Sequence, residues 1–307
     1  MDKVEWIWRD GEMIPWDQAN VHVLTHGLHY GLAVFEGIRC YAHKGGGGAI
    51  FRLDEHIERL FESAHICLME VPHSVESVIG ACKDIVTKNG MTDGCYLRPL
   101  VYSGYGSLGI AALTNPIHTM VAGWRWGTYL GEEGVKNGIR VTISGWRRPR
   151  GDAFSPKGKI SGQYVLSILA KREAMAAGFE EALFLDDNGY AVEGTGENLF
   201  VIKNGVVRTP SIGQAILGGI TRDTAMTLLR AEKIDIVEGP ITRDELFTAD
   251  EIFLTGTAAE VTPVREIDGR VIGKGKPGTV TEMMKKNYAA CVRGELEEYA
   301  HWITRIE

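Results

Sequence analysis

The chain has 307 residues, which is enough for one large or two smaller domains with a sizeable core. Its formal net charge of −7 argues against nucleic acid or an anionic membrane surface as the main partner. The five cysteines are scattered without a Cys-x-x-Cys pair, and we find neither a signal peptide nor an apolar run of membrane-spanning length. We therefore expect a cytoplasmic protein without a disulfide framework or a zinc cluster.

The first part of the chain is predicted to combine short strands with an amphipathic helix. Residues 4–16 read as a hairpin around Asp10-Gly11. A run of four glycines at 45–48 predicts a mobile loop, and it lacks the Gly-Lys-Ser/Thr ending of a phosphate-binding loop. Residues 53–68 place their apolar side chains on one face of a helix. Further strands are expected at 95–103 and 118–126.

The segment HYGLAVFEGIRCY, residues 29–41, mixes aromatic and small side chains in a pattern suited to lining a pocket. The nearby His22, His26 and His29 could suggest a metal, but no neighbouring carboxylate completes a ligand set. We expect structural histidines and no metal site.

The second part of the chain is predicted to begin after a connecting segment that includes residues 127–138. Its Asn-Gly and Asp-Gly pairs predict hairpins, with helices between them. This mixture of hairpins and helices indicates an α+β fold. The hairpins are expected at 181–194, 198–210 and around 268–269, and the helices at 163–178, 221–232 and 242–247.

Two lysines, Lys157 and Lys159, lie in a Pro/Gly/Ser-rich loop just before a patterned helix that contains Tyr164. A lysine whose pKa is lowered by burial or a neighbouring cation can attack a carbonyl carbon and form a Schiff base. Both lysines could equally be solvated loop charges, and the loop alone does not decide between them.

Glu193 lies on a predicted strand that starts at Tyr190 and precedes Gly194, Thr195 and Gly196, whose small size would let a flat ligand approach the backbone. On an alternating strand, Ala191 and Glu193 would share one face. Glu193 could be a solvated residue at a strand end, or a carboxylate that holds the ring nitrogen of pyridoxal phosphate.

Two turns are suited to binding an anion. Gly218 and Gly219 precede Ile220 and Thr221 at a predicted helix start, where free N–H groups favour negative charge. Thr221 could instead be an ordinary N-cap. Residues 255–260 repeat the arrangement after a strand, with a hydroxyl on Thr257.

Five motifs, in this order and across nearly the whole chain, resemble the branched-chain amino-acid aminotransferases of pyridoxal phosphate (PLP) fold type IV. They are HYGxxxFEGIRCY, KxSGxYxxSxxAKREA, EGxGENLF, GITRD and GTAAEVTPV. The family's Schiff-base lysine lies five residues before the tyrosine of its motif, so the resemblance selects Lys159 over Lys157.

The resemblance implies a PLP site in which Lys159 forms the Schiff base and moves the proton between the substrate Cα and the coenzyme C4′. Tyr164 would hydrogen-bond the coenzyme O3′, and Glu193 would pair with the pyridine nitrogen. Leu217 would pack on the ring. The phosphate would be bound by Arg59, Ile220, Thr221 and Thr257.

The resemblance also implies reversible transamination of leucine, isoleucine and valine with 2-oxoglutarate by ping-pong kinetics. The substrate carboxylates would be read by Tyr96, Arg98 and the Thr257-Ala258 turn, with Arg148 or Arg150 as rivals to Arg98. The apolar pocket would be lined by Tyr30, Phe35, Gly37, Trp126 and Tyr129.

In fold type IV the active site lies between two domains and takes residues from a second subunit. The resemblance therefore implies a small α/β domain at 1–122, an interdomain loop at 123–135 and a large PLP-binding domain at 136–307. It also implies at least a homodimer, with a hexamer as the larger alternative.

Some residues depart from the family pattern. The family often has proline where Gly218 stands, the four-glycine run lengthens a loop, and residues 104–116 resemble the pocket-closing loop only loosely. Arg147, Arg148 and Arg150 precede the lysine. These changes leave open a broader specificity for (R)-amines or D-amino acids as the alternative function.

Overall fold

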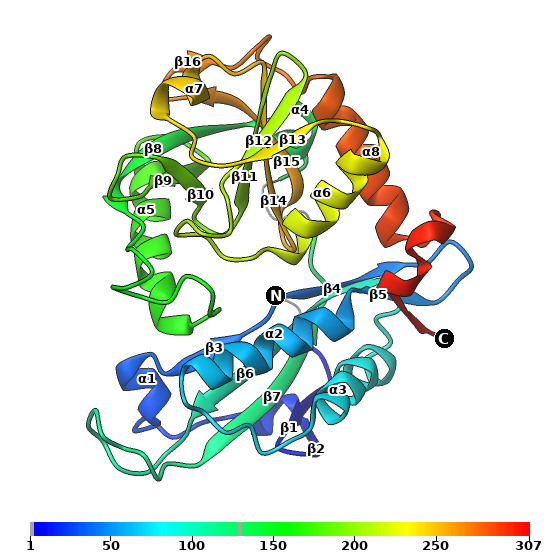
Figure 1. Ribbon diagram of the computed structural model, residues 1–307. Coiled ribbons are helices and arrows are strands. Elements are labelled where there is room, and N and C mark those ends of the chain that lie inside the picture. Colours follow the sequence, from blue (N-terminus) through cyan, green and yellow to red (C-terminus); the bar gives the residue numbers. More distant parts are fainter. Residues whose placement is uncertain (1–2, 128–130) are drawn as a thin grey trace. The chain divides into compact units, whose positions relative to one another are not determined.

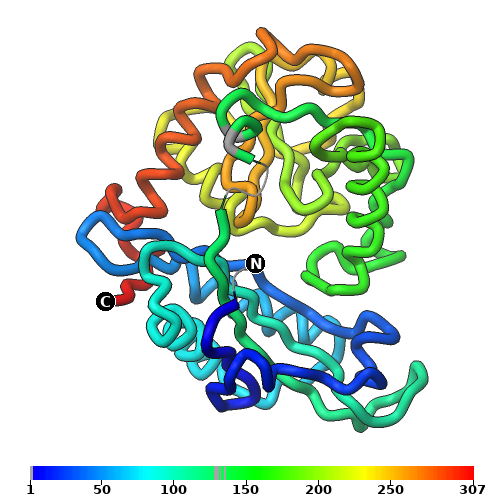
Figure 2. The backbone as a smooth tube through the Cα atoms, turned by 180° about the vertical axis from the view of Figure 1, so that it is seen from behind, coloured from blue at the N-terminus to red at the C-terminus, as the bar shows by residue number. Residues whose placement is uncertain are grey.

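The computed structural model describes residues 3–127 and 131–307, and Tyr129 of the expected substrate pocket lies outside them. The chain divides into two compact units, each with its own sheet (Figures 1 and 2). Unit 1 comprises Met1–Gly127, Gly158–Tyr164 and Ala290–Glu307, and unit 2 comprises Thr128–Lys157 and Val165–Ala289. Residues 158–164 and 290–307, which the expected boundaries assign to the second domain, therefore group with unit 1.

Unit 1 is an antiparallel sheet covered by helices. The strand order is β17-β5-β4-β6-β7-β1-β2, with β3 also paired to β6. The apolar face of α2 (Leu53–Ile66) packs with α3 (Val75–Lys88) on this sheet and forms its core. The other elements are β1 Trp6–Arg9, β2 Glu12–Pro15, α1 His26–Tyr30, β3 Ala33–Phe35, β4 Ile38–Ala42, β5 Gly48–Phe51, β6 Gly94–Ser103, β7 Ile117–Trp124 and β17 Ile303–Ile306.

Unit 2 contains a closed barrel. Its strands follow the order β10-β9-β8-β15-β14-β11, and β10 also pairs with β11, which closes the ring. The order continues to β12 and β13, and β16 pairs with β15. The elements are α4 Gly131–Asn137, β8 Ile139–Arg147, α5 Tyr164–Ala176, β9 Glu181–Leu185, β10 Ala191–Gly194, β11 Asn198–Lys203, β12 Val206–Thr209, α6 Ile220–Ala231, β13 Ile236–Glu238, α7 Arg243–Phe247, β14 Glu251–Gly256, β15 Glu260–Ile267, β16 Arg270–Val271 and α8 Thr279–Val292.

The predicted α+β composition and hairpins are confirmed. The turns at Asp10-Gly11, Asn204-Gly205 and Asp268-Gly269 each have positive φ at both positions, which is why Gly follows Asn or Asp there. The barrel is mixed, because β8 pairs in parallel with both β9 and β15. Among the described residues, no helix is both long enough and apolar enough to cross a membrane.

Candidate active site

The loop that carries Lys159 is fixed to unit 1 by its backbone. The Phe35 N–H donates to the Lys159 carbonyl at 3.1 Å, and the Lys159 N–H donates to Ser63 Oγ at 3.0 Å. Gly31 has a φ of +70°, and a Cβ added to it would lie 2.9 Å from Gly162 Cα. Glycine at both positions thus allows the two backbones to touch. The lysine is therefore held by a rigid scaffold even though its segment is a loop.

The side chain of Lys159 points to Tyr164. Its Nζ donates to the Tyr164 hydroxyl at 2.7 Å and lies 5.0 Å from the centre of the Phe35 ring. The short 3₁₀ turn Ser161–Gln163 separates the two residues and brings the tyrosine back over the lysine. The amine is held by one hydrogen bond beside aromatic faces, which suits a nucleophile that must exchange this partner for a carbonyl carbon.

Lys157 is exposed, as expected of a loop charge, and its side chain is held by backbone carbonyls. Its Nζ donates to the carbonyl oxygens of Ile212 and, at 3.2 Å, of Ile216. Partial burial lowers the pKa of Lys157, with the Glu193 carboxylate opposing the shift. Lys157 therefore ties its loop to the segment that precedes Leu217.

Glu193 is a buried carboxylate with several donors, so its interpretation as a solvated strand-end residue is wrong. Arg148 Nε donates to Oε1 at 2.8 Å. The Leu217 N–H and Asn198 Nδ2 donate to Oε2 at 3.1 and 3.3 Å. Donors on both oxygens stabilise the ionised carboxylate. This is the form that can accept a hydrogen bond from the N–H of a protonated ring nitrogen.

A β-bulge places Glu193. Ala191 pairs with Leu185 and Glu193 with Phe184, so the register shifts between Ala191 and Glu193. The regular alternation expected for residues 190–193 is therefore interrupted here. A bulge redirects one side chain and disrupts the ladder locally, so the faces that the sequence assigned to Ala191 and Glu193 by simple alternation do not apply here.

The other carboxylates behind β10 are neutralised. Glu181 is fully buried and accepts from Lys171 Nζ at 2.5 Å and Thr195 Oγ1 at 2.7 Å. Burial, and then the nearby Glu181, raise the pKa of Glu197 to about 8. At neutral pH Glu197 is therefore mostly protonated, and the charge of Glu193 is balanced locally by Arg148.

The start of α6 is one of the two turns expected to bind an anion. The N-cap of α6 is Gly219, which provides no side-chain cap, so Thr221 is not the N-cap. A Cβ on Gly219 would overlap Asn198 Oδ1, and Asn198 Nδ2 donates to the Leu217 carbonyl at 2.9 Å. Asn198 thus fixes the backbone that leads into the helix, whose N–H groups and dipole favour negative charge.

Thr257 and Ala258 lie in the tight turn between β14 and β15, where Gly256 pairs with Glu260. Their side chains are half-buried. In unit 1, Arg59 of α2 makes a two-pronged ion pair with Glu36, through Nε at 2.6 Å and Nη2 at 2.9 Å. These groups are the expected phosphate and carboxylate contacts.

The expected substrate residues Gly37, Tyr96 and Arg98 form one group in unit 1. A Cβ on Gly37 would overlap the Tyr96 hydroxyl, so the phenol covers this glycine. Arg98 Nη2 donates to the same hydroxyl at 3.3 Å, and the guanidinium stacks on Phe35 at 4.7 Å. Arg98 Nε is buried without a hydrogen-bond partner among the described residues.

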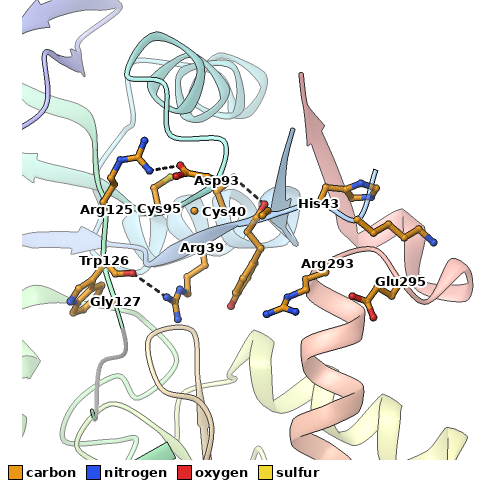
Figure 3. A pocket seen from close by; sticks show the side chains of 14 residues that line it. Arg39, Cys40, His43, Asp93, Cys95, Arg125, Trp126, Gly127, Arg293 and Glu295 are labelled. Atoms are coloured by element: carbon orange, nitrogen blue, oxygen red, sulfur yellow. Dashed lines mark hydrogen bonds and ion pairs between the residues drawn. The ribbon is translucent and has the colours of Figure 1, made fainter. Parts of the chain in front are cut away.

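Trp126 packs edge-on against Tyr96, with ring centres 4.6 Å apart. It lies on an open pocket of about 760 Å³ in unit 1, and its carbonyl accepts a hydrogen bond from Arg39 (Figure 3). Tyr30 is 49% exposed on α1.

Of the proposed rivals to Arg98, Arg148 is paired with Glu193, and Arg150 forms an exposed pair with Asp152.

Glu36, His56 and Asn198 were not expected to have a role in the site, and Arg148 was expected to have a different one. Glu36 and His56 lie within the quoted FEG motif and the predicted helix, but their partner Arg59 is distant from Glu36 in sequence. Asn198 belongs to the EGxGENLF motif. The sequence motifs therefore contained these residues, but only the folded structure shows which residues they contact.

Residues 33–267 match the family model Amino-transferase class IV. Over 301 residues the chain is 46% identical to a branched-chain-amino-acid aminotransferase of Pseudomonas aeruginosa, covering 98% of this chain and 97% of the relative. The chain belongs to the branched-chain-amino-acid aminotransferases of class IV. An enzyme of this family from Escherichia coli is 40% identical over 310 residues, with 99% of this chain and 98% of the relative covered.

Solved structures of branched-chain-amino-acid aminotransferases have the same fold. The T.th. enzyme with pyridoxamine 5′-phosphate matches with a TM-score of 0.96 at 45% identity, covering 100% of both chains. The same enzyme with N-(5′-phosphopyridoxyl)-L-glutamate and with 4-methylvaleric acid matches with a TM-score of 0.95 at 43% identity, again over 100% of both chains. The expected family and the two-domain fold type IV are confirmed.

Proposed function

We propose that this chain transfers amino groups between branched-chain L-amino acids and 2-oxoglutarate with PLP as coenzyme. The observation that carries the proposal is the hydrogen bond between Lys159 Nζ and the Tyr164 hydroxyl, on a lysine fixed by Ser63 and Phe35. The relatives are named for this activity, and related structures contain a coenzyme–glutamate adduct and an apolar carboxylic acid.

The described residues fit PLP. When bound, the coenzyme supplies an electron sink for the carbanion that forms at the substrate Cα. Lys159 anchors the coenzyme and moves the proton at Cα, while Tyr164 holds the phenolic oxygen. Glu193, ionised and supported by Arg148, keeps the ring nitrogen protonated, and Leu217 packs on the ring. Arg59, Thr257 and the α6 N-terminus at Ile220 and Thr221 bind the phosphate.

The same pocket must accept an aliphatic side chain and a second carboxylate. Phe35, Gly37 and Trp126 provide apolar walls, with Tyr30 as a further wall. Arg98 binds the distal carboxylate of glutamate, while Tyr96 and the Thr257-Ala258 turn bind the carboxylate at Cα. The grouping of Arg98 with the Tyr96 hydroxyl and the Phe35 ring supports this division of roles.

An absorbance scan followed by a substrate panel tests the proposal. We expect a visible band from lysine-bound coenzyme that disappears when L-leucine or L-glutamate is added. A panel of L-amino acids, D-amino acids and (R)-amines then measures the specificity. Faster turnover of D-amino acids or (R)-amines than of L-leucine would support the alternative function instead.

Glu193→Gln is expected to slow the half-reaction with L-leucine by roughly 100- to 1,000-fold, because the amide cannot hold the ring nitrogen protonated. PLP affinity should fall much less, since the change acts on the chemical step. Single-turnover kinetics measure the first effect and coenzyme titration the second. Arg148→Met is the matched control: it keeps the carboxylate and its contacts with Leu217 and Asn198 and should slow the reaction less. An unchanged rate in Glu193→Gln would remove the carboxylate from the chemistry.

The chain is proposed to act as a homodimer at least. Val23, Leu28, Ile110 and Leu113 of unit 1 are between 65% and 94% exposed. A groove of about 280 Å³ beside Leu28 is lined mainly by apolar side chains such as Ile7, Val21 and Leu100. Exposed apolar side chains of this number are typical of a surface that a second subunit covers.

Ile110→Lys is expected to shift the dimer toward monomer, because the charge would be buried without a partner in the interface. Sedimentation velocity measures the effect. Leu68→Lys is the control, because Leu68 is 90% exposed but lies just after α2, whereas Ile110 lies between β6 and β7. A monomeric wild-type protein, or equal behaviour of both variants, would contradict the assignment of this surface.

We also place the enzyme in the cytoplasm. All five cysteines are free thiols, and four of them are buried. Unpaired cysteines are typical of a reducing compartment.

A further inference from the structure

Glu36 connects β3 to β4 and is completely buried. Its Oε1 accepts from Arg59 Nε at 2.6 Å. Its Oε2 accepts from Arg59 Nη2 at 2.9 Å, His56 Nδ1 at 2.7 Å and the Gly37 N–H at 3.3 Å. A carboxylate with this many donors has no freedom to rotate, and it imposes its orientation on the guanidinium.

The charges of this cluster follow from its contacts. Burial would raise the pKa of Glu36, but Arg59 and His56 outweigh it and hold that pKa far below the usual range. Burial lowers the pKa of His56, and Glu36 only partly opposes this. Glu36 is therefore an anion, and a neutral His56 donates to it from Nδ1. The cluster has no net charge, because Arg59 and Glu36 cancel.

Helix α2 connects the cluster to the lysine. His56, Arg59 and Ser63 follow one another at spacings of three and four residues, which places them on one face of the helix. The first two contact Glu36, and the third accepts the Lys159 N–H. One rigid helix therefore sets the positions of both the lysine and the arginine.

We propose that Glu36 and His56 are positioning residues for phosphate recognition: they fix the Arg59 guanidinium by one edge so that it presents the other edge to the coenzyme phosphate. This inference rests on the proposed function, in which Arg59 binds that phosphate. The fork on Glu36 uses the Nε–H and an Nη2–H of Arg59, which lie on one edge of the guanidinium. Fixing the side chain in advance removes the ordering cost that a mobile arginine would add to binding.

The sign of one measurement separates positioning from simple charge. Coulomb's law alone predicts that removing the Glu36 carboxylate would strengthen the binding of an anion by Arg59. Positioning predicts the opposite. Glu36→Gln keeps the size and one acceptor but loses the fork, so a weaker phosphate contribution can come only from the lost orientation of Arg59.

The experiment compares PLP with pyridoxal, which lacks the phosphate. Full-length protein freed of coenzyme is titrated with each, and the ratio of the two dissociation constants reports the contribution of the phosphate. We expect the preference for PLP over pyridoxal to fall about 10-fold in Glu36→Gln. Inorganic phosphate should also compete less well with PLP in this variant. Ser63→Ala, on the same helix face, is the matched control and should keep the wild-type ratio.

The outcomes are distinguishable. If Arg59→Met keeps the wild-type ratio, Arg59 does not bind the phosphate, and both the assignment and this inference fail. If Arg59→Met loses the preference but Glu36→Gln keeps or increases it, the assignment stands and positioning is overturned. An equal loss of affinity for PLP and pyridoxal in Glu36→Gln indicates a merely structural role and also overturns it. Should Glu36→Gln fail to fold, His56→Leu decides: a reduced ratio supports positioning and an unchanged one overturns it.

Discussion

Replacing Lys159 with alanine is expected to abolish turnover while the chain still binds PLP. Alanine can neither anchor the coenzyme covalently nor move the proton at the substrate Cα. We expect kcat to fall by at least ~10⁴-fold, in line with the removal of a residue that serves as both nucleophile and base. The visible band of lysine-bound coenzyme should also disappear. Absorbance titration and single-turnover kinetics with L-leucine measure both effects.

Lys157→Ala is the matched control for this experiment. It should retain the band and the turnover but lose about 1 kcal/mol of the free energy of unfolding, because Lys157 Nζ binds the carbonyls of Ile212 and Ile216. Thermal unfolding measures the loss. An inactive Lys157 variant beside an active Lys159 variant would reverse the assignment of the two lysines.

Arg98→Met is expected to separate the two kinds of substrate. Glutamate brings a second carboxylate, whose burial without a partner is costly, whereas leucine needs only apolar walls. Removing a charge-assisted contact costs about 1.5–3 kcal/mol, so kcat/KM for glutamate and 2-oxoglutarate should fall roughly 10- to 150-fold. Methionine keeps much of the packing of the arginine stem, so leucine and its keto acid should lose much less. Steady-state kinetics on both substrates measure the difference.

The other arginines serve as controls for this prediction. Arg150→Met should leave both substrates unaffected, since Arg150 is exposed and paired with Asp152. Arg148→Met should affect leucine and glutamate alike, because Arg148 supports Glu193. Equal losses for leucine and glutamate in Arg98→Met would mean that Arg98 only braces its strand.

The sequence, together with its resemblance to a family, was sufficient for the local features of the site. Lys159 and Tyr164 are five residues apart in one motif, and Glu193 lies on a strand that could be predicted. The hairpins were also predictable, because Asn-Gly and Asp-Gly turns depend on the φ angles of two adjacent residues. In each case the physical cause lies within a few residues of the effect.

The partners of these residues were not predictable, because they are distant in the chain. Arg59 and Glu36 are 23 residues apart, and Arg148 and Glu193 are 45 apart. Arg148 was expected only as a rival to Arg98 for the substrate carboxylate, because the sequence does not show that Glu193 lies beside it. The bulge at Glu193 was missed for the same reason, since it depends on the register with β9.

The contact between Gly37 and Tyr96 has a consequence for enzyme engineering. A side chain at position 37 would displace the Tyr96 phenol, and that phenol accepts the hydrogen bond from Arg98 and packs against Trp126. If Gly37 and Arg98 have the substrate roles proposed above, changing the volume at position 37 also moves the group proposed to select dicarboxylates. Selection of substrates by side-chain volume and selection by charge are therefore coupled through Tyr96. Directed evolution toward bulkier substrates should yield paired substitutions at positions 37 and 96 more often than single ones.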